Sequence, residues 1–311
     1  MATNAADRRW ATVVRPGART SLQDAGRPGL AHLGVPRSGA LDPAAHALAN
    51  RLVGNGPAAA TLETTVDGVV LRLGAPAVLA VTGAPAPVTV DRRSVPWGLP
   101  VRVSAGGVLE VGRAEAGVRS YVAVAGGFDV PPVLGSRSTD ALSGLGPPPL
   151  TPGMRLRIGE PLRAPAALDM APYRGPAAHA ELTVHPGPRR DWLTDDAARS
   201  LFAQAYTVAQ DSNRVGLRLS GRPLARRHEG ELPSEGIVWG SVQLLPDGQL
   251  VVLLADHPTT GGYPVVGVVD PGDAAACAQA APGTSVRLRP ARGQSSGPKR
   301  RSPASPSPGT M

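Results

Sequence analysis

Short apolar runs that alternate with polar residues recur along this chain, and they constrain its fold more than any other feature. Leu217 and Leu219 flank Arg218, and Val286 and Leu288 alternate with arginines. Alternation with a period of two is typical of a β-strand with one solvated face. Further strands are predicted at 69–73, 78–82, 101–104, 108–111, 121–125, 154–158, 182–185, 242–245, 250–254 and 265–269. Since no βαβ rhythm appears, these strands favour antiparallel sheets or barrels.

Three short, alanine-rich helices are predicted between the strands, each after a residue that can cap it. The caps and helices are Asp42 with Ala44–Val53, Thr194 with Asp195–Ala205, and Asp273 with Ala274–Ala281. An Asp-Gly pair at 247–248, between two apolar runs, predicts a β-hairpin. The predicted fold class is therefore mostly β, with a few short helices.

The 311 residues are enough for two domains with sizeable cores. A stretch rich in Pro and Ala at 161–178 is typical of a connection. We therefore expect an N-terminal β domain at 11–165 and a C-terminal β domain at 178–290. Residues 1–10 are expected to be flexible. Residues 291–311 combine Pro, Gly and Ser with basic residues and no apolar periodicity, which predicts a disordered basic tail.

Composition excludes several kinds of chemistry. Lys299 is the only lysine, so the rest of the chain can offer neither a Schiff base nor a P-loop lysine. The one cysteine, Cys277, is expected to be a small buried residue. The six histidines form no pair with metal-ligand spacing, so no metal site is expected.

Charge and hydropathy bear on partners and location. The tail at 291–311 holds +4 of the net charge of +8, and only ten residues are aromatic, so no specific nucleic-acid partner is expected. No apolar run approaches the length of a membrane span, and the first ten residues have no signal-peptide pattern. These features predict no membrane partner and a cytoplasmic location.

Polar, glycine-rich loop segments are candidates for a functional site, because loops on a rigid scaffold often carry chemistry. The first holds Gln23, Asp24 and Arg27. The second holds Ser136, Arg137, Ser138 and Thr139. Hydroxyls beside a guanidinium can bind a carboxylate or a phosphate, and a purely structural Ser/Thr turn is an equal alternative.

Three more segments follow in the C-terminal half. In the third, Arg214 either clamps an anion or pairs with Asp211. In the fourth, Ser234 and Glu235 offer a hydroxyl and a proton acceptor, although an exposed glutamate is usually only a solvated charge. The fifth follows a predicted strand and suits a site, with a tight turn as the alternative. Its residues include Asp256, Thr259, Thr260, Gly261, Gly262 and Tyr263.

These segments extend into longer stretches whose order is specific: TSLQDAGRPGLAHLGVPRSGALDPAAHALANRLVGN (20–55), the pair Leu62-Glu63, RSYVAVAGGFDVPPVLGSRSTD (119–140), SNRVGLRLSG (212–221), ELPSEGIVWGSVQLLPDGQ (231–249) and LLADHPTTGGYPVVGVV (253–269). Together they resemble the family of allophanate hydrolase subunit 2 and the C component of 5-oxoprolinase, also called the biotin-dependent carboxyltransferase family. The resemblance covers about residues 12–290. The sequence departs from the family at 146–150 and at His257-Pro258.

The resemblance implies two cyclophilin-like β-barrel domains and a role as one component of an enzyme complex. The implied partners are a B component, similar to allophanate hydrolase subunit 1, and an A component of the LamB/YcsF type. That complex hydrolyses ATP, its co-substrate, to open 5-oxo-L-proline to L-glutamate, which is hydrolysis of a cyclic amide. Since this chain has no P-loop, ATP would bind it atypically or bind mainly to a partner.

Within that complex we expect proton handling or water positioning by Asp24, Glu235 and Asp256. Anion contacts are expected from Arg27, Arg137 and Arg214, and the segment Thr259–Gly262 is expected to surround the bound anion. Gln23, Ser136, Ser138, Thr139, Ser234 and Tyr263 complete the expected binding residues. Two alternatives stay open: a carboxyltransferase subunit of a urea-amidolyase-like system with a biotinylated partner, and a non-enzymatic regulator of a kinase-inhibitor partner.

Overall fold

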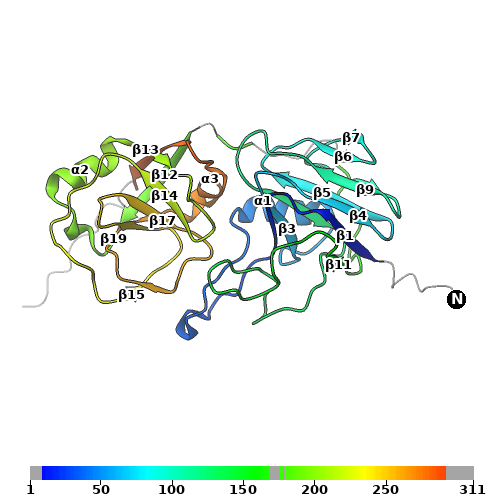
Figure 1. Cartoon of the computed structure of the whole chain (residues 1–311), viewed down its shortest axis with the longest axis horizontal. Helices are drawn as coiled ribbons and strands as arrows, with labels where there is room; N and C mark the ends of the chain where they lie inside the picture. The colour runs from blue at the N-terminus through cyan, green and yellow to red at the C-terminus, as the bar shows by residue number, and fades with distance from the viewer. Residues whose placement is uncertain (1–8, 169–174, 178, 292–311) are drawn as a thin grey trace, which may run out of the picture.

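The computed structural model describes residues 9–168, 175–177 and 179–291. Its strands form two groups, which lie beside each other in Figure 1: one from residues 10–157 and one from residues 180–290. Apart from Ala291, the predicted tail at 291–311 lies outside the described residues, as does most of the predicted flexible segment at 1–10. The mostly β prediction with a few short helices is confirmed.

Two antiparallel sheets make up the N-terminal group. The first has the order β11-β1-β4-β9-β6-β7 and the second β2-β3-β10-β5-β8. One apolar cluster contains side chains of both sheets, such as Leu71 and Leu109 from the first and Leu62 and Val122 from the second, so the sheets face each other across this core. The strands of the first sheet are β1 (Trp10–Arg15), β4 (Val70–Leu73), β6 (Val88–Val90), β7 (Arg93–Val95), β9 (Val108–Val111) and β11 (Arg155–Arg157). Those of the second are β2 (Arg19–Gln23), β3 (Thr61–Thr65), β5 (Ala77–Gly83), β8 (Val101–Val103) and β10 (Ser120–Val124).

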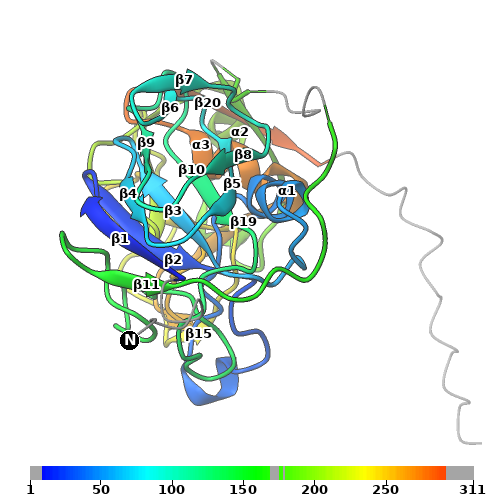
Figure 2. The same cartoon turned by 90° about the vertical axis from the view of Figure 1, so that its right-hand side faces the viewer.

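Helix α1 (Pro43–Leu52) covers the other face of the second sheet. Ala45 and Ala49 pack with Ala80 and Ala123 of that sheet, and Figure 2 shows α1 beside β5. Small side chains on both partners let the helix lie close to the strands. The second sheet is thus buried on both faces, and all five residues of β10 are buried.

The C-terminal group is a closed barrel with the strand order β12-β19-β16-β17-β14-β13-β20. Its first and last strands are parallel neighbours, with Ala180 opposite Val286, and the other pairs are antiparallel. The strands are β12 (Ala180–Pro186), β13 (Ala205–Val208), β14 (Gly216–Ser220), β16 (Ser241–Leu244), β17 (Leu250–Leu253), β19 (Val265–Val269) and β20 (Ser285–Pro290). A two-stranded pair, β15 (Glu235–Gly236) with β18 (Thr260–Gly261), stands apart from the barrel.

Helices α2 (Asp195–Ala203) and α3 (Ala274–Gln279) contribute Leu201 and Cys277 to the barrel core. Cys277 is buried, as predicted, and burial raises the pKa of its thiol to about 12. The thiol therefore stays protonated at neutral pH, which does not suit a nucleophile. None of the helices within the described ranges is long and apolar enough to cross a membrane.

Local signals in the sequence place most of these elements correctly. The Asp42 side chain accepts a hydrogen bond from Ala45 N at 3.0 Å, and Thr194 accepts one from Ala197 N at 3.3 Å, so both predicted caps are confirmed. Asp273 lies at the N-cap position of α3, as predicted, but its side chain does not cap the helix, because its carboxylate accepts a hydrogen bond from Thr183 N on β12. The predicted hairpin is the pair β16–β17.

Gly126, in the loop after β10, shows how closely the backbone packs at the edge of the core between the two N-terminal sheets. Its φ is +94°, and a Cβ added there would collide with the carbonyl oxygen of Gly159. We expect Gly126→Ala to lower the free energy of unfolding by about 2–3 kcal/mol in urea denaturation, because strain and collision add. Gly135 also has a positive φ, +79°, but open space around it, so Gly135→Ala is expected to cost only about 1 kcal/mol. Equal losses for the two variants would contradict this account.

Candidate functional site

A buried polar layer joins the two groups of strands, with Arg214 at its centre. The Arg214 guanidinium donates to both oxygens of Asp256, Nε to Oδ2 at 2.8 Å and Nη2 to Oδ1 at 2.9 Å. It also donates to Glu63 Oε1 at 2.5 Å and to Gly39 O at 2.7 Å. All three charged side chains are at most 5% exposed. Arg214 thus links its own half of the chain to two points in the other half.

Glu63, on β3, is held from its own side of the layer as well. Tyr121 OH donates to it at 2.8 Å and Leu41 N at 3.0 Å, and an Arg119 guanidinium nitrogen lies 3.7 Å away. Burial alone would raise the pKa of the Glu63 carboxyl, but Arg214 and Arg119 outweigh it and lower that pKa. Burial and the Glu63 charge raise the pKa of Tyr121. Glu63 is therefore ionised and Tyr121 neutral at neutral pH.

The same balance keeps Arg214 charged. Burial acts to lower its pKa, but the carboxylates of Glu63 and Asp256 raise it overall. Asp256 also accepts hydrogen bonds from Ser38 Oγ at 2.7 Å and Ala141 N at 2.9 Å. Each buried charge in the layer is therefore both paired and hydrogen-bonded, which is the condition for a stable buried ion pair.

Gln279, on α3, makes a second link between the halves. Its Oε1 accepts from the backbone N–H groups of Val118 and Arg119, both at 3.0 Å. Its Nε2 donates to Arg119 O at 2.9 Å and to Asp42 Oδ2 at 3.1 Å. With the Arg214 layer, this link fixes the orientation of the barrel against the two sheets.

Asp24, directly after β2, organises the neighbouring loops. Its carboxylate accepts four hydrogen bonds: from Gly26 N at 2.8 Å, from the hydroxyls of Ser136 and Ser138 at 2.6 Å each, and from Arg137 N at 2.6 Å. Four donors nearly fill the acceptor positions of a carboxylate. Asp24 thus ties the 24–27 loop to the 136–138 loop.

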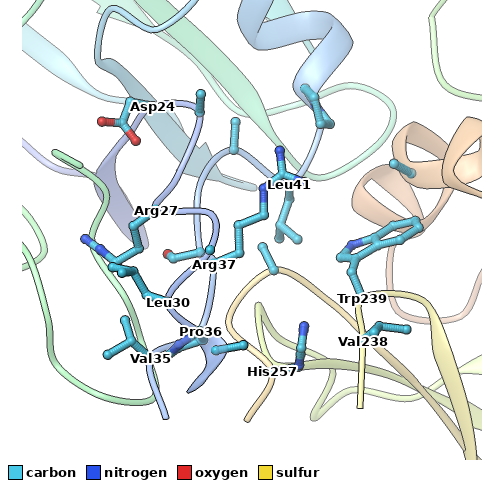
Figure 3. Close-up of a pocket in the computed structure, with 18 of the residues that line it drawn as sticks. Asp24, Arg27, Leu30, Val35, Pro36, Arg37, Leu41, Val238, Trp239 and His257 are labelled. Carbon is cyan, nitrogen blue, oxygen red and sulfur yellow. The ribbon is translucent and has the colours of Figure 1, made fainter. Parts of the chain in front are cut away.

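A cavity of about 650 Å³ lies beside this network, between the two halves of the chain. Most of its wall is apolar and includes Leu41, Val238 and Trp239 (Figure 3). Its charged or titratable lining residues are Asp24, Arg27, Arg37, His46 and His257. A concave, mostly apolar site with a few polar groups suits a small organic molecule.

Arg37 and Arg27 differ in what they can offer this cavity. Arg37 is exposed, its side chain makes no hydrogen bond or ion pair with another described residue, and in Figure 3 this side chain extends toward Leu41. Arg27 is 2% exposed and points the other way, where Nη2 donates to Ser138 O at 2.6 Å. The guanidinium that is free to meet a bound anion is therefore that of Arg37.

The chain matches a known family over most of its length. The profile of the carboxyltransferase domain, subdomain A and B, matches residues 33–290. This chain belongs to the carboxyltransferase domain family. A relative, the C subunit of 5-oxoprolinase from Escherichia coli, is 36% identical over 260 residues, which are 83% of each chain.

Larger proteins contain the same domain. Urea amidolyase of Saccharomyces cerevisiae is 31% identical over 310 residues, which span 91% of this chain but 17% of that protein. The crystal structure of the K. lactis urea amidolyase superimposes with a TM-score of 0.85 at 29% identity, over 91% of this chain and 19% of that one. This carboxyltransferase domain therefore occurs both in chains of about this length and within much longer ones.

Two histidines of the carboxyltransferase domain face the cavity in neutral form. Burial lowers the pKa of both His46 and His257. His257 Nδ1 lies 2.6 Å from Pro258 O, which can only accept, so the proton is assigned to Nδ1 and Nε2 keeps its lone pair. His46 Nε2 lies 3.0 Å from Pro57 O, and Nδ1 lies 2.9 Å from the Thr61 hydroxyl. His257 is thus the better proton acceptor for a molecule in the cavity.

These two lowered pKa values predict a loss of stability in mild acid. The unfolded chain binds protons at both histidines near their ordinary pKa of about 6.5, whereas the folded domain binds them only at lower pH. Their contribution is present above pH 6.5 and is lost as the pH falls through the folded-state pKa. We expect the urea concentration at half-unfolding to decrease when the pH is lowered from 7.5 to 5.5. The double variant His46→Gln/His257→Gln should show a smaller fall, and an identical fall would contradict this assignment.

The structure brings many of the expected site residues together. Gln23, Asp24, Arg27, Ser136, Arg137, Ser138 and Thr139 form one hydrogen-bonded group of loops. Thr259 lines the cavity with Asp24 and Arg27. Arg214 and Asp256 lie in the buried layer, and Asp211 pairs with Arg218 instead.

The remaining expected residues lie at or beside the β15–β18 pair. They are Ser234, Glu235, Thr260, Gly261, Gly262 and Tyr263, and they do not line the cavity. Glu235 makes a bidentate ion pair with Arg189, and this pair lowers the pKa of the Glu235 carboxyl. In the part of the chain that the structure describes, no group of three or more His, Cys, Asp or Glu residues could hold a metal ion. The functional roles expected for these residues stay predictions.

Sequence reasoning missed four residues that define the site: Arg37, His46, Trp239 and Glu63. Arg37 lies in the first candidate loop, but nothing local separates it from a solvated charge. Glu63 lies on β3, where four of five residues are buried. An acid within such a buried strand is a usable signal, because a buried charge needs a partner.

Proposed function

We propose that this chain is the C component of an ATP-dependent 5-oxoprolinase complex, which opens 5-oxo-L-proline to L-glutamate. The observation that carries the proposal is the cavity between the two halves, with the unpaired Arg37 guanidinium beside an apolar wall. The relative named as the C subunit of 5-oxoprolinase supports it, because the match spans 83% of both chains. The proposed partners are a B component of the allophanate hydrolase subunit 1 type and an A component of the LamB/YcsF type.

The cavity suits such a substrate chemically. A 5-oxoproline molecule has an apolar ring edge, an amide and one carboxylate. In our proposal the carboxylate binds Arg37, the ring packs on the wall near Trp239, and His257 Nε2 accepts a proton.

The proposed reaction balances with one ATP and two molecules of water. The γ-phosphoryl group passes to the amide oxygen and ADP leaves. One water adds to the activated carbon and the ring C–N bond breaks, which leaves an acyl phosphate that a second water hydrolyses to glutamate and phosphate. With no P-loop and no lysine before residue 299, this chain suits substrate binding better than phosphate binding. We therefore propose that ATP binds mainly to a partner protein.

Arg37→Ala tests the proposal in the assembled complex. We expect the KM for 5-oxoproline to rise at least about tenfold, since a charge-assisted hydrogen bond is lost. The measurement is glutamate release and ADP formation by the chain co-expressed with its two proposed partners. Arg93→Ala, an exposed arginine on β7 outside the cavity, is the matched control. A complete complex that releases no glutamate would reject the proposed reaction, and an unchanged KM would reject the role of Arg37.

A second candidate function is carboxyl transfer to urea. It is favoured by the superposition on the K. lactis urea amidolyase, with a TM-score of 0.85. The test supplies a carboxylated biotin carrier protein, urea and the assembled complex, and measures loss of carboxyl groups from biotin. Urea-dependent loss together with silence toward 5-oxoproline would favour this candidate.

A further inference from the structure

A second cavity, of about 410 Å³, opens beside the buried polar layer. It shares no lining residue with the first cavity, and Arg214 belongs to its wall. Both halves of the chain contribute to it: the Thr65–Val66 corner and Val118–Arg119 from one, the 210–217 segment and helix α3 from the other. It is therefore a separate site, formed only when the two halves are together.

This second cavity is positively charged. Three arginines line it, Arg19, Arg119 and Arg214, and no carboxylate does. Within the polar layer, the charges of Arg214 and Arg119 are balanced by those of Asp256 and Glu63. Arg19 makes no ion pair with any described residue, so its charge is in excess.

Arg119 is buried but incompletely bonded. It is 6% exposed, its Nη1 donates to Thr65 Oγ1 at 3.1 Å, and its Nε is buried without a hydrogen-bond partner among the described residues. Arg119 therefore keeps its charge at the cavity wall, where its guanidinium is only partly hydrogen-bonded.

The other residues that line the second cavity indicate the polarity of a suitable ligand. Its apolar part comes from Val66, Val118, Leu217, Leu254, Cys277 and Ala278. Gln210 and Asn213, both exposed, add polar groups to the same cavity wall. The free Arg19 guanidinium can bind the two oxygens of a carboxylate through two parallel N–H groups, and the apolar wall suits a ligand with an aliphatic body.

We propose that this second cavity binds a small organic carboxylate: a carboxylate head between Arg19 and Arg119, on a short aliphatic body against the apolar wall. The site is independent of the proposed reaction, since no residue of the first cavity takes part.

The test uses hexanoate as the probe and the full chain, by isothermal titration calorimetry. We expect saturable binding of one hexanoate. Hexanamide, which has the same body without the charge, should bind at least about tenfold more weakly, and inorganic phosphate should also bind more weakly. Arg19→Ala should weaken hexanoate binding at least about tenfold, and this exposed, unpaired residue can be removed without breaking a contact in the fold.

Arg102→Ala is the matched control, because Arg102 is also exposed and unpaired and lies on β8, at the opposite edge of the same sheet from β2. It should change the affinity less than about twofold, since it lies outside the cavity. Absence of saturable hexanoate binding, or an equal loss in Arg19→Ala and Arg102→Ala, would overturn the proposal. Loss of binding in Arg37→Ala but not in Arg19→Ala would assign the hexanoate to the first cavity and also overturn it.

Discussion

Arg214→Ala is expected to lower the free energy of unfolding by about 3–5 kcal/mol, because it leaves two carboxylates buried without their cation. Asp256 would lose both of its guanidinium bonds, and Glu63 would keep only the more distant charge of Arg119. The measurement is urea denaturation followed by tryptophan fluorescence and by circular dichroism. The two signals should separate in the variant, because the link between the halves is weakened.

Arg218→Ala is the control for this loss. Arg218 pairs with Asp211 at 2.9 Å, but both side chains are about half exposed or more. An exposed ion pair contributes about 0–1 kcal/mol, so this variant should stay close to the unmodified protein. Arg214→Lys should fall between the two, since an ammonium cannot bind both carboxylates in the planar geometry of a guanidinium. A loss below about 1 kcal/mol for Arg214→Ala would show that the layer contributes little to stability.

Asp24→Asn is expected to lower the turnover of the assembled complex by about 10- to 100-fold, with the fold retained. Asparagine has the same shape but only one acceptor oxygen, so it cannot accept the four hydrogen bonds that Asp24 accepts. Three of the four bonds go to Oδ1 and only that of Arg137 N to Oδ2, so an amide nitrogen at the Oδ2 position would face this donor and weaken the tie between the loops at 24–27 and 136–138. Hydrogen exchange should become faster at Arg137 N, the backbone donor to Oδ2.

Hydrogen exchange also separates two roles for Asp24. If Asp24 only transfers a proton, Asp24→Asn should lose turnover with unchanged exchange at Arg137 N, as the proton-handling prediction requires. If Asp24 holds the loops, turnover and protection from hydrogen exchange should be lost together. Asp196→Asn is the control, because Asp196 is an exposed carboxylate on α2, paired only with Arg199 among the described residues. It should change neither turnover nor the exchange of the Asp24 loops.

The sequence predicts a strand where its residues form a recognisable apolar pattern. Strands β14 and β20 alternate because one side meets solvent, and the fully buried β10 and β17 are apolar runs. Strands β2 and β3 show neither pattern, because they bury polar residues such as Thr20, Thr61 and Glu63. Local caps are equally readable, except at Asp273, whose carboxylate finds a donor on a strand about ninety residues away in sequence.

The site is less predictable than the fold, for a related reason. The loops around Asp24 could be singled out because glycine, hydroxyl and charged residues are dense there. The sequence could not show which of their charges is free. Arg27 and Arg37 lie ten residues apart in one loop, and only tertiary contacts distinguish them. Likewise, Arg214 could be paired with the nearby Asp211, but its partners are Asp256 and Glu63, far away in sequence.

In each half of the chain the first strand pairs with the last, which bears on how the protein folds during its synthesis on the ribosome. Trp10 lies opposite Arg157 in the first half, and Ala180 lies opposite Val286 in the second. The barrel of the second half cannot close until β20 has been synthesised, and the first sheet lacks its edge strand β11 until residue 157 has been added. The first half is complete earlier, and until Arg214 is synthesised its Glu63 has only Arg119 as a cationic neighbour. During synthesis of the second half, the Glu63 carboxylate of a nascent chain therefore lacks the nearer of its two cationic partners, at the surface that the barrel will later cover.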